Sequence, residues 1–236
     1  MPAPSFRLLD RFEHTFLGTK YRHRDSSLGN KIGRELFEDL ILHRSDSLLA
    51  QRAATNTVVV NSEGKIHRQH RLIRRNDSVM GLPPAGVMNL RQLPGCSFQL
   101  GPVADPHIAC EVKIVAKSQA KQIDRVLSDL RGFAEGMKRL NERCINIAIA
   151  GVNHESNYVG YEGKRAFRDA LRVDESANTE SILGQLTDVY DELLILPFKA
   201  SNQKPYPFSW LRPEAARLDY GAVVTRMLAE YEHRFR

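Results

Sequence analysis

Two acidic residues and a lysine lie within nine positions of one another, at Asp105, Glu111 and Lys113. Apolar residues alternate with other residues through this segment, which predicts a strand over residues 107–114 with one apolar face. Glu111 and Lys113 are two residues apart and therefore project from the same face of that strand. Charges on a strand that is otherwise buried are costly unless they pair with each other or bind a metal.

These residue types also have a chemistry in common. Carboxylates are hard oxygen donors, and Mg²⁺ commonly takes one or two of them while keeping several waters. A lysine beside them would orient or deprotonate a water, or neutralise charge that develops on a phosphate. The segment thus predicts a metal site with a catalytic lysine, and the alternative is a salt bridge between Glu111 and Lys113 on a half-exposed strand. By the same alternation His107 shares the Glu111 face, where it is expected to neighbour the site rather than to act as a ligand.

The elements that must position these residues follow from hydrophobic periodicity. Apolar residues at three- and four-residue steps predict a helix over 30–43, and a strand over 58–60 is followed by a turn and a returning strand over 66–73. Glycines and prolines predict a long loop over 76–96. After the strand at 107–114, a helix over 119–141 and a strand over 144–152 predict a right-handed parallel crossover.

The rest of the chain predicts further α/β structure. A polar loop is expected over 153–163, helices over 164–172 and 180–190, a strand over 192–198 and a C-terminal helix over 219–235. This order favours one mixed α/β domain with a central sheet and flanking helices. Its expected parts are an N-terminal arm at 1–29, which includes a short helix at 6–16, a core at 30–163 and a C-terminal elaboration at 164–236.

At Asp105 and Glu111-Val112-Lys113 the chain resembles the PD-(D/E)XK, or restriction-endonuclease-like, nuclease superfamily. The signature of that superfamily is an Asp, a variable gap, then Asp or Glu, any residue and Lys, on a core that runs helix, three antiparallel strands, helix and strand. Residues 30–152 follow this order. The resemblance implies a metal-dependent DNA endonuclease that acts in restriction, defence or repair. It further implies that Asp105 and Glu111 ligate Mg²⁺, for which Mn²⁺ would substitute, and that Lys113 helps to activate the attacking water.

The resemblance leaves two assignments open. The gap of six between Asp105 and Glu111 is short for the superfamily, and the order is Asp-Pro instead of Pro-Asp, so Asp77 is a rival for the first acidic position. The superfamily often places an acidic residue on its first helix, facing the site. Glu38 is the preferred candidate for that role and Glu35 is the alternative, because Glu38 lies nearer the edge of the apolar stripe.

The net charge of +6 is concentrated around the same residues. Residues 61–125 hold ten Lys and Arg against five Asp and Glu. The alternatives are a solvated basic face and a surface that contacts phosphates, where each cation adds salt-sensitive affinity. On the second interpretation the side chains expected to contact DNA are Lys117, Lys121, Arg71, Arg74 and Arg75. The first two open the predicted helix at 119–141, and a helix N-terminus itself favours phosphate.

Composition limits the remaining choices. The chain has 236 residues, of which 42% are hydrophobic and 26% are charged, as in an ordinary folded domain. No run of apolar residues is long enough to span a membrane, and three cysteines without metal spacing suit a reducing cytoplasm. A homodimer is expected by analogy, because cutting both strands of a duplex takes two active sites. The alternative function is a non-catalytic nucleic-acid-binding or assembly protein on the same fold.

Overall fold

The computed structural model describes residues 5–22, 27–61, 66–68, 71–73, 78–87, 89–162, 165–170 and 174–236. The described helices are α1 (Arg7–His14), α2 (Ser27–His43), α3 (Leu48–Ala54), α4 (Gln119–Leu140), α5 (Glu175–Gly184) and α6 (Pro213–Phe235). The described strands are β1 (Val59–Asn61), β2 (Ile66–Arg68), β3 (Arg71–Ile73), β4 (Ser78–Leu82), β5 (Arg91–Gln92), β6 (Gln99–Leu100), β7 (Asp105–Val115), β8 (Ile145–Asn153), β9 (Asn157–Glu162), β10 (Arg165–Ala170), β11 (Glu192–Ala200) and β12 (Phe208–Trp210).

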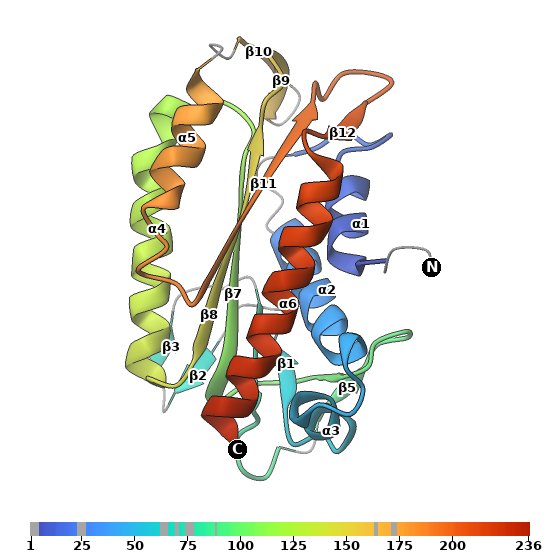
Figure 1. Cartoon of the computed structure of the whole chain (residues 1–236), viewed down its shortest axis with the longest axis vertical. Coiled ribbons are helices and arrows are strands. Elements are labelled where there is room, and N and C mark those ends of the chain that lie inside the picture. Colours follow the sequence, from blue (N-terminus) through green and yellow to red (C-terminus); the bar gives the residue numbers. More distant parts are fainter. Residues whose placement is uncertain are drawn as a thin grey trace.

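A mixed eight-stranded sheet organises the chain, in the order β12-β11-β8-β7-β4-β1-β6-β5. β7, β8 and β11 run parallel to one another, whereas β4 is antiparallel to both β7 and β1. β7 therefore lies in the interior of the sheet, between a parallel and an antiparallel neighbour (Figure 1). The expected mixed α/β class and the parallel connection from β7 through α4 to β8 are both confirmed.

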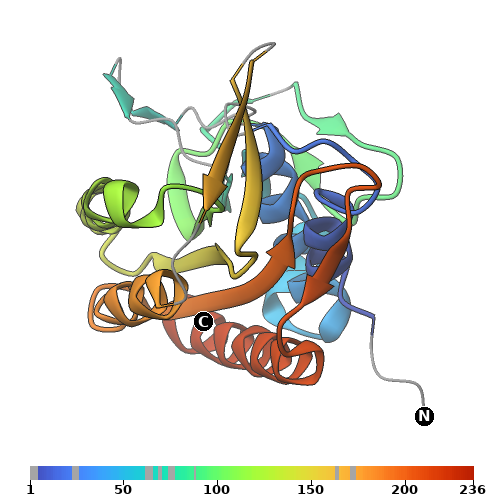
Figure 2. The same ribbon diagram turned by 90° about the horizontal axis from the view of Figure 1, so that it is seen from above.

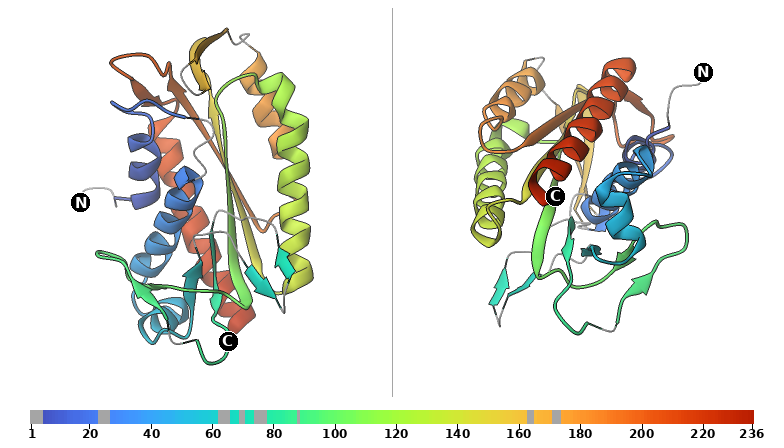
Figure 3. Two further views of the ribbon diagram at one scale, coloured as in Figure 1. Left: turned by 180° about the vertical axis from the view of Figure 1, so that it is seen from behind. Right: turned by 60° about the horizontal axis from the view of Figure 1, so that its bottom comes forward.

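Helices cover both faces of the sheet. α4 and α5 lie on one side, and α1, α2 and α6 lie on the other, as the views from above and from behind show (Figures 2 and 3). Two apolar cores result. One contains Ile108, Cys110 and Val112 of β7 with residues of α1, α2 and α6, and the other contains Ala109 of β7 with the apolar stripe of α4. The predicted N-terminal arm is part of the first core, because Phe12 and other apolar residues of α1 are buried there.

The strongest periodic patterns give the elements that were expected. The alternation through β7, the apolar stripe of α4 and the alternating isoleucines of β8 each fold as predicted, with bounds within two residues. The helix predicted at 30–43 begins three residues earlier, at Ser27. The C-terminal helix is longer than predicted and begins at Pro213, a residue that suits the first turn because its missing N–H needs no partner there.

One prediction about strand pairing is wrong. Residues 66–73 do not return alongside β1, because β2 and β3 pair only with each other in a separate two-stranded sheet. The antiparallel partner of β1 is β4, which falls inside the predicted loop at 76–96. Gly81 contributed to the prediction of a loop, but it lies within a strand because the strand pairing requires glycine there. A Cβ at this position would lie 2.0 Å from the carbonyl oxygen of Asp105 on β7. Glycine thus allows β4 and β7 to approach, with a register shift between Met80 and Gly81.

A second correction concerns residues 153–172. The predicted loop at 153–163 contains β9, and the helix predicted at 164–172 is instead β10 over its described part. The two strands form an antiparallel hairpin, with Phe167 paired to Gly160. Short helical periodicity is a weak signal here, since the antiparallel pairing of β9 with β10 decides the conformation of the segment. Among the described residues, no helix has the length and apolar character needed to cross a membrane.

Candidate functional site

Glu111 and Lys113 form an ion pair on β7, as their spacing predicts. Lys113 Nζ lies 2.8 Å from Glu111 Oε1 and 3.8 Å from Asp129 Oδ2, which α4 contributes from the layer above the sheet. Glu111 is only 7% exposed, whereas the Lys113 side chain remains 26% exposed. The ammonium group therefore lies between two carboxylates, on the face of the sheet covered by α4.

Small residues make room for this charged group. On β8, Ala148 pairs with Glu111 and Ala150 pairs with Lys113, and both alanines are fully buried. Tyr190 also lies close by. Burial raises the pKa of its hydroxyl first, and the negative charge of Glu111 raises it further, so that Tyr190 remains a neutral donor to the Leu130 carbonyl at 2.7 Å. The polar group thus sits in an otherwise apolar layer.

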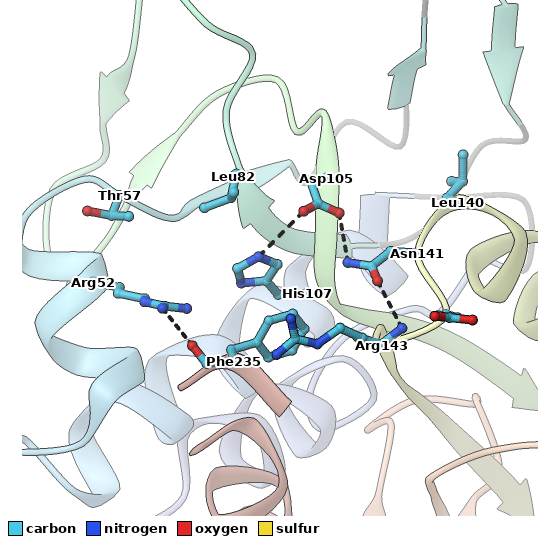
Figure 4. A pocket seen from close by; sticks show the side chains of 10 residues that line it. Arg52, Thr57, Leu82, Asp105, His107, Leu140, Asn141, Arg143 and Phe235 are labelled. Carbon is cyan, nitrogen blue, oxygen red and sulfur yellow. Dashed lines mark hydrogen bonds and ion pairs between the residues drawn. The ribbon is translucent and has the colours of Figure 1, made fainter. Parts of the chain in front are cut away.

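Asp105 does not join this site, so its predicted role as a metal ligand beside Glu111 is wrong. Both residues lie on one extended strand, and six residues at about 3.3 Å each separate them by roughly 20 Å. Asp105 is the first residue of that strand. Asp105 Oδ1 instead accepts a hydrogen bond from Asn141 Nδ2 at 2.7 Å, at the opposite end of β7 (Figure 4).

His107 also leaves the Glu111 face. The register shift opposite Gly81 places an extra residue in β7, and such a β-bulge reverses the alternation beyond it. The imidazole stacks on Phe235 of α6 with ring centroids 3.9 Å apart, and its Nδ1 lies 3.0 Å from the Tyr231 hydroxyl. Burial, together with the positive charges of Arg52 and Arg143, lowers its pKa to about 4, so the ring is neutral.

A pocket of about 660 Å³ opens beside these two residues. Its lining includes Asp105, His107, Arg52 and Arg143, which come from β7, α3 and the turn after α4 (Figure 4). Arg52 is engaged in the fold, since its Nη2 donates to the Phe235 carbonyl at 2.7 Å. The pocket lies at the amino end of β7, whereas Lys113 lies near its carboxyl end, so the pocket is separate from the Glu111 site.

The acidic candidates on α2 point away from Glu111. Glu38 is 1% exposed, and its Oε1 accepts the Ser97 amide at 2.6 Å while Arg7 lies 3.5 Å from Oε2. Glu35 accepts two hydrogen bonds from Arg11, at 3.1 and 3.3 Å. α2 packs in the core on the other side of the sheet from α4, so β7 itself separates both carboxylates from Glu111. The predicted role of Glu38 at the site is therefore wrong, and Glu35 does not replace it.

The rival first aspartate cannot be placed. Asp77 lies outside the described residues, as do Arg74 and Arg75. β4 begins at the next residue, Ser78, which pairs with Cys110, the neighbour of Glu111 on β7. The structure therefore brings the described end of β4 alongside the Glu111 position.

Three predicted DNA contacts remain. Lys117 and Lys121 follow the carboxyl end of β7, whereas Arg71 lies in a separate sheet. Lys117 crosses Gly160 of the β9–β10 hairpin so closely that a Cβ on that glycine would meet the lysine Cδ at 2.9 Å. Lys121 is exposed on the first turn of α4. Arg71 belongs to β3, in the small separate sheet, and its side chain lies outside the described part of the structure.

The N-terminus of α4, where the sequence favours phosphate, is already partly satisfied by groups of the protein. Glu175 Oε1 of α5 accepts the Ala120 amide at 2.8 Å, and Ser118 accepts the Lys121 amide at 3.1 Å through its carbonyl. A carboxylate in this position satisfies an orphan donor and complements the helix dipole. An anion approaching this helix end would have to displace Glu175 or bind beside it.

Three features of the site were missed from the sequence. Asp129 lies off the apolar stripe of α4 and carried no signal, because the pairing of a helix residue with a strand residue depends on how the two elements pack. The alanines of β8 did have a signal in the sequence. They alternate with isoleucines, which indicates a strand face with space beside it. Glu175 fell outside every predicted helix and was not recognised as a cap.

The donors near Lys113 fit a metal ion only in part. Glu111 and Asp129 are hard oxygen ligands of the type that Mg²⁺ takes, but the Lys113 ammonium lies between them. Within the described ranges, no three or more His, Cys, Asp or Glu side chains are grouped so as to hold a metal ion. No known protein-family model matches the chain. No significantly similar curated protein is found either.

Proposed function

We propose that this chain is a metal-dependent nuclease that hydrolyses DNA phosphodiester bonds on a restriction-endonuclease-like core. The order of elements supports the proposal. After α2, the strands β1, β4 and β7 lie side by side and antiparallel, and α4 then leads to the parallel strand β8. This is the order of helix, three antiparallel strands, helix and strand that the resemblance implies.

The Glu111–Lys113 ion pair is the observation that carries the proposal. A buried ion pair often stabilises a fold no better than well-packed apolar residues of the same volume. This one occupies the central strand, beside alanines and with Lys113 still partly accessible. Glu-x-Lys in that position has the composition of a hydrolytic site, with a carboxylate that would hold a metal and a lysine that would orient water.

The second acidic ligand is taken to be Asp77 in this proposal, because Asp105 is too distant. Asp77 directly precedes Ser78 in the sequence, and Ser78 is the residue of β4 that pairs beside Glu111. Asp129 is the alternative among the described residues, through its approach to Lys113. When bound, Mg²⁺ would supply positive charge to the phosphate and acidify a water. Lys113 would hold that water and compensate charge on the phosphate oxygens.

One observation favours a second function, that of a nucleic-acid-binding protein without catalysis. The Lys113 ammonium is already paired with Glu111 and also lies near Asp129, so its charge is compensated within the fold. A site of this kind would retain the fold and the basic surface and have no hydrolytic activity. The two functions differ in one measurable property, which is cleavage in the presence of a divalent metal.

Cleavage of supercoiled, linear, single-stranded and branched DNA with Mg²⁺ or Mn²⁺ tests the proposal directly. Wild-type protein should nick or cut at least one substrate, and EDTA should abolish the activity. Glu111→Gln and Lys113→Met should each reduce the rate at least about a hundredfold, as expected for loss of a group that acts on the proton or the metal. Asp77→Asn and Asp129→Asn identify the second carboxylate by the same loss.

Glu192→Gln is the matched control, because Glu192 is a largely buried carboxylate in an ion pair elsewhere, 2.7 Å from Arg226. This variant should cleave as the wild type does. If wild-type protein binds DNA but cleaves none of the four substrates with either metal, the non-catalytic function replaces the nuclease. Equal rates for Glu111→Gln and wild type would likewise reject the assignment of this site.

A further inference from the structure

The β9–β10 hairpin stands apart from the main sheet. Its strands pair only with each other, over six residue pairs from Arg165–Glu162 to Ala170–Asn157. The hairpin rises at the end of the molecule where β7 ends and α4 begins (Figures 1 and 2). β9 anchors the hairpin, because Tyr158 belongs to the core that contains α1, α2 and α6 and Val159 is also buried. The described side chains of β10 are exposed and belong to neither core, so they need another explanation.

Phe167 is the exposed aromatic side chain on this hairpin. Phe167 is 46% exposed, and among the described residues it is the one aromatic residue in the set of exposed large apolar residues. Its cross-strand partner is Gly160, which has no side chain to cover the ring. The hairpin tyrosines differ, since Tyr158 is buried and Tyr161 lies under the Lys20 ammonium at 3.4 Å from its ring centroid.

Cations lie on the same hairpin as the exposed ring. Arg165 and Arg168 of β10 are both exposed, and residues 164–172 of the sequence hold four Lys and Arg against one Asp. Arg165 is two residues from Phe167 and shares its face, whereas Arg168 is the next residue and projects from the opposite face. Lys117 reaches the hairpin from the end of β7, where its side chain crosses Gly160. Because Gly160 and Phe167 are cross-strand partners, Lys117 and the ring lie on the same face of the hairpin.

This face continues from the Glu111 site. Lys113 and Lys117 are four residues apart, at the end of β7 that lies nearest the hairpin. A nucleic-acid strand whose phosphates contact Lys113 and then Lys117 would reach Phe167 next. An exposed aromatic ring among cations is the arrangement that holds unpaired bases: the ring stacks on a base and the cations contact the backbone.

We propose that the β9–β10 hairpin binds DNA that has an unpaired base, with Phe167 stacked on that base. Arg165 and Lys117, which lie on the same face as the ring, contact the adjoining phosphates. The choice of DNA as the nucleic acid rests on the proposed function, whereas the preference for unpaired bases comes from the hairpin itself. A paired base in a duplex has both faces stacked already, so the ring adds affinity only where a base is free.

Fluorescence anisotropy with a labelled single-stranded oligonucleotide and with a duplex of the same sequence tests the proposal, in EDTA so that no cleavage occurs. Phe167→Ala should weaken binding of the single strand about tenfold or more and change duplex binding little. Phe167→Tyr keeps a ring and should restore most of the affinity. Arg165→Ala should weaken binding of both ligands and reduce the dependence of affinity on salt concentration.

Leu218→Ala is the matched control, since Leu218 is another exposed apolar residue, 73% exposed on α6. It should bind both ligands as the wild type does. Three results would overturn the proposal: no binding of single-stranded DNA by wild-type protein, equal affinity of Phe167→Ala and wild type, or equal losses for Phe167→Ala and Leu218→Ala. Dissociation of a dimer by Phe167→Ala in sedimentation, with DNA affinity unchanged, would also overturn it and assign the hairpin to self-association.

The two proposals can fail separately. If no substrate is cleaved but Phe167→Ala selectively weakens single-strand binding, the hairpin assignment stands and the nuclease assignment falls. If Glu111→Gln abolishes cleavage while Phe167→Ala binds and cleaves every substrate as the wild type does, the nuclease stands and the hairpin assignment falls.

Discussion

Replacing His107 by phenylalanine should make the stability of the protein less sensitive to acid. The imidazole is buried against Phe235, and charged groups reach it from several elements: Arg52 on α3, Arg143 after α4 and Asp105 on β7. Its pKa is lowered to about 4 from an ordinary 6.5. In the unfolded chain the ring takes up a proton near pH 6.5, so the unfolded state binds more protons than the folded state between pH 6.5 and pH 4.

The size of the effect follows from the two pKa values. A folded pKa of about 4 against 6.5 corresponds to roughly 3 kcal/mol of unfolding free energy. Above pH 6.5 the imidazole does not lower the free energy of unfolding. The free energy of unfolding falls by this amount as the pH drops toward 4. Phenylalanine keeps the stacking on Phe235 but loses the hydrogen bond to the Tyr231 hydroxyl, a cost of about 1 kcal/mol that does not vary with pH in this range.

Urea unfolding followed by circular dichroism, at a series of pH values between about 7.5 and 4.5, measures the difference. His107→Phe should be the less stable protein at neutral pH and the more stable one near pH 4.5. Tyr231→Phe is the control, because it removes the same hydrogen bond and keeps the titrating ring, so its stability should fall with acid as in the wild type. A constant difference between His107→Phe and wild type across the series would refute the reasoning.

Three further substitutions test how buried and capping polar groups stabilise the fold, each by urea unfolding. Asp39→Ala should cost about 3 kcal/mol, because the carboxylate accepts two backbone amides of α1 and the Tyr220 hydroxyl, all of which would lose their partner; a loss below about 1 kcal/mol would show that water replaces it. Asn153→Ala should cost about 2–3 kcal/mol, since this buried amide joins β8 to β11 and to the end of β7. Glu175→Ala should cost only about 1 kcal/mol, by leaving the Ala120 amide uncapped, and unchanged stability would mean that solvent satisfies this amide equally well.

Periodicity alone was enough to predict the centre of the fold. β7, α4 and β8 each have a strong apolar pattern of sufficient length, and their order dictates a parallel crossover. The pairing of Glu111 with Lys113 followed from the alternation of side chains along a strand, which is a local property. Prediction failed in the hairpin of β9 and β10, where pairing between the two strands, and not the weak helical periodicity of residues 164–172, decides the conformation.

Gly81 explains two of the failures together. Its presence favoured the prediction of a loop over residues 78–82. The close approach of β4 to β7 instead requires a residue without a Cβ at position 81. The bulge that accompanies this approach turns His107 to the face of α6, although simple alternation places it beside Glu111. Neither effect has a signature in the sequence, because both depend on which strand becomes the neighbour of β7.

Local patterns in the sequence were sufficient to predict the class of fold, the existence of a central charged strand and the pairing of Glu111 with Lys113. These depend on local periodicity, which one stretch of chain specifies without reference to another. The tertiary structure decided which residues surround that pair: it brought Asp129 and the alanines of β8 to it, kept Asp105 at the far end of β7 and left Glu38 across the sheet. The physical reason is that strand pairing and the packing of helices on the two faces bring distant parts of the chain together, and no single stretch of sequence specifies those contacts.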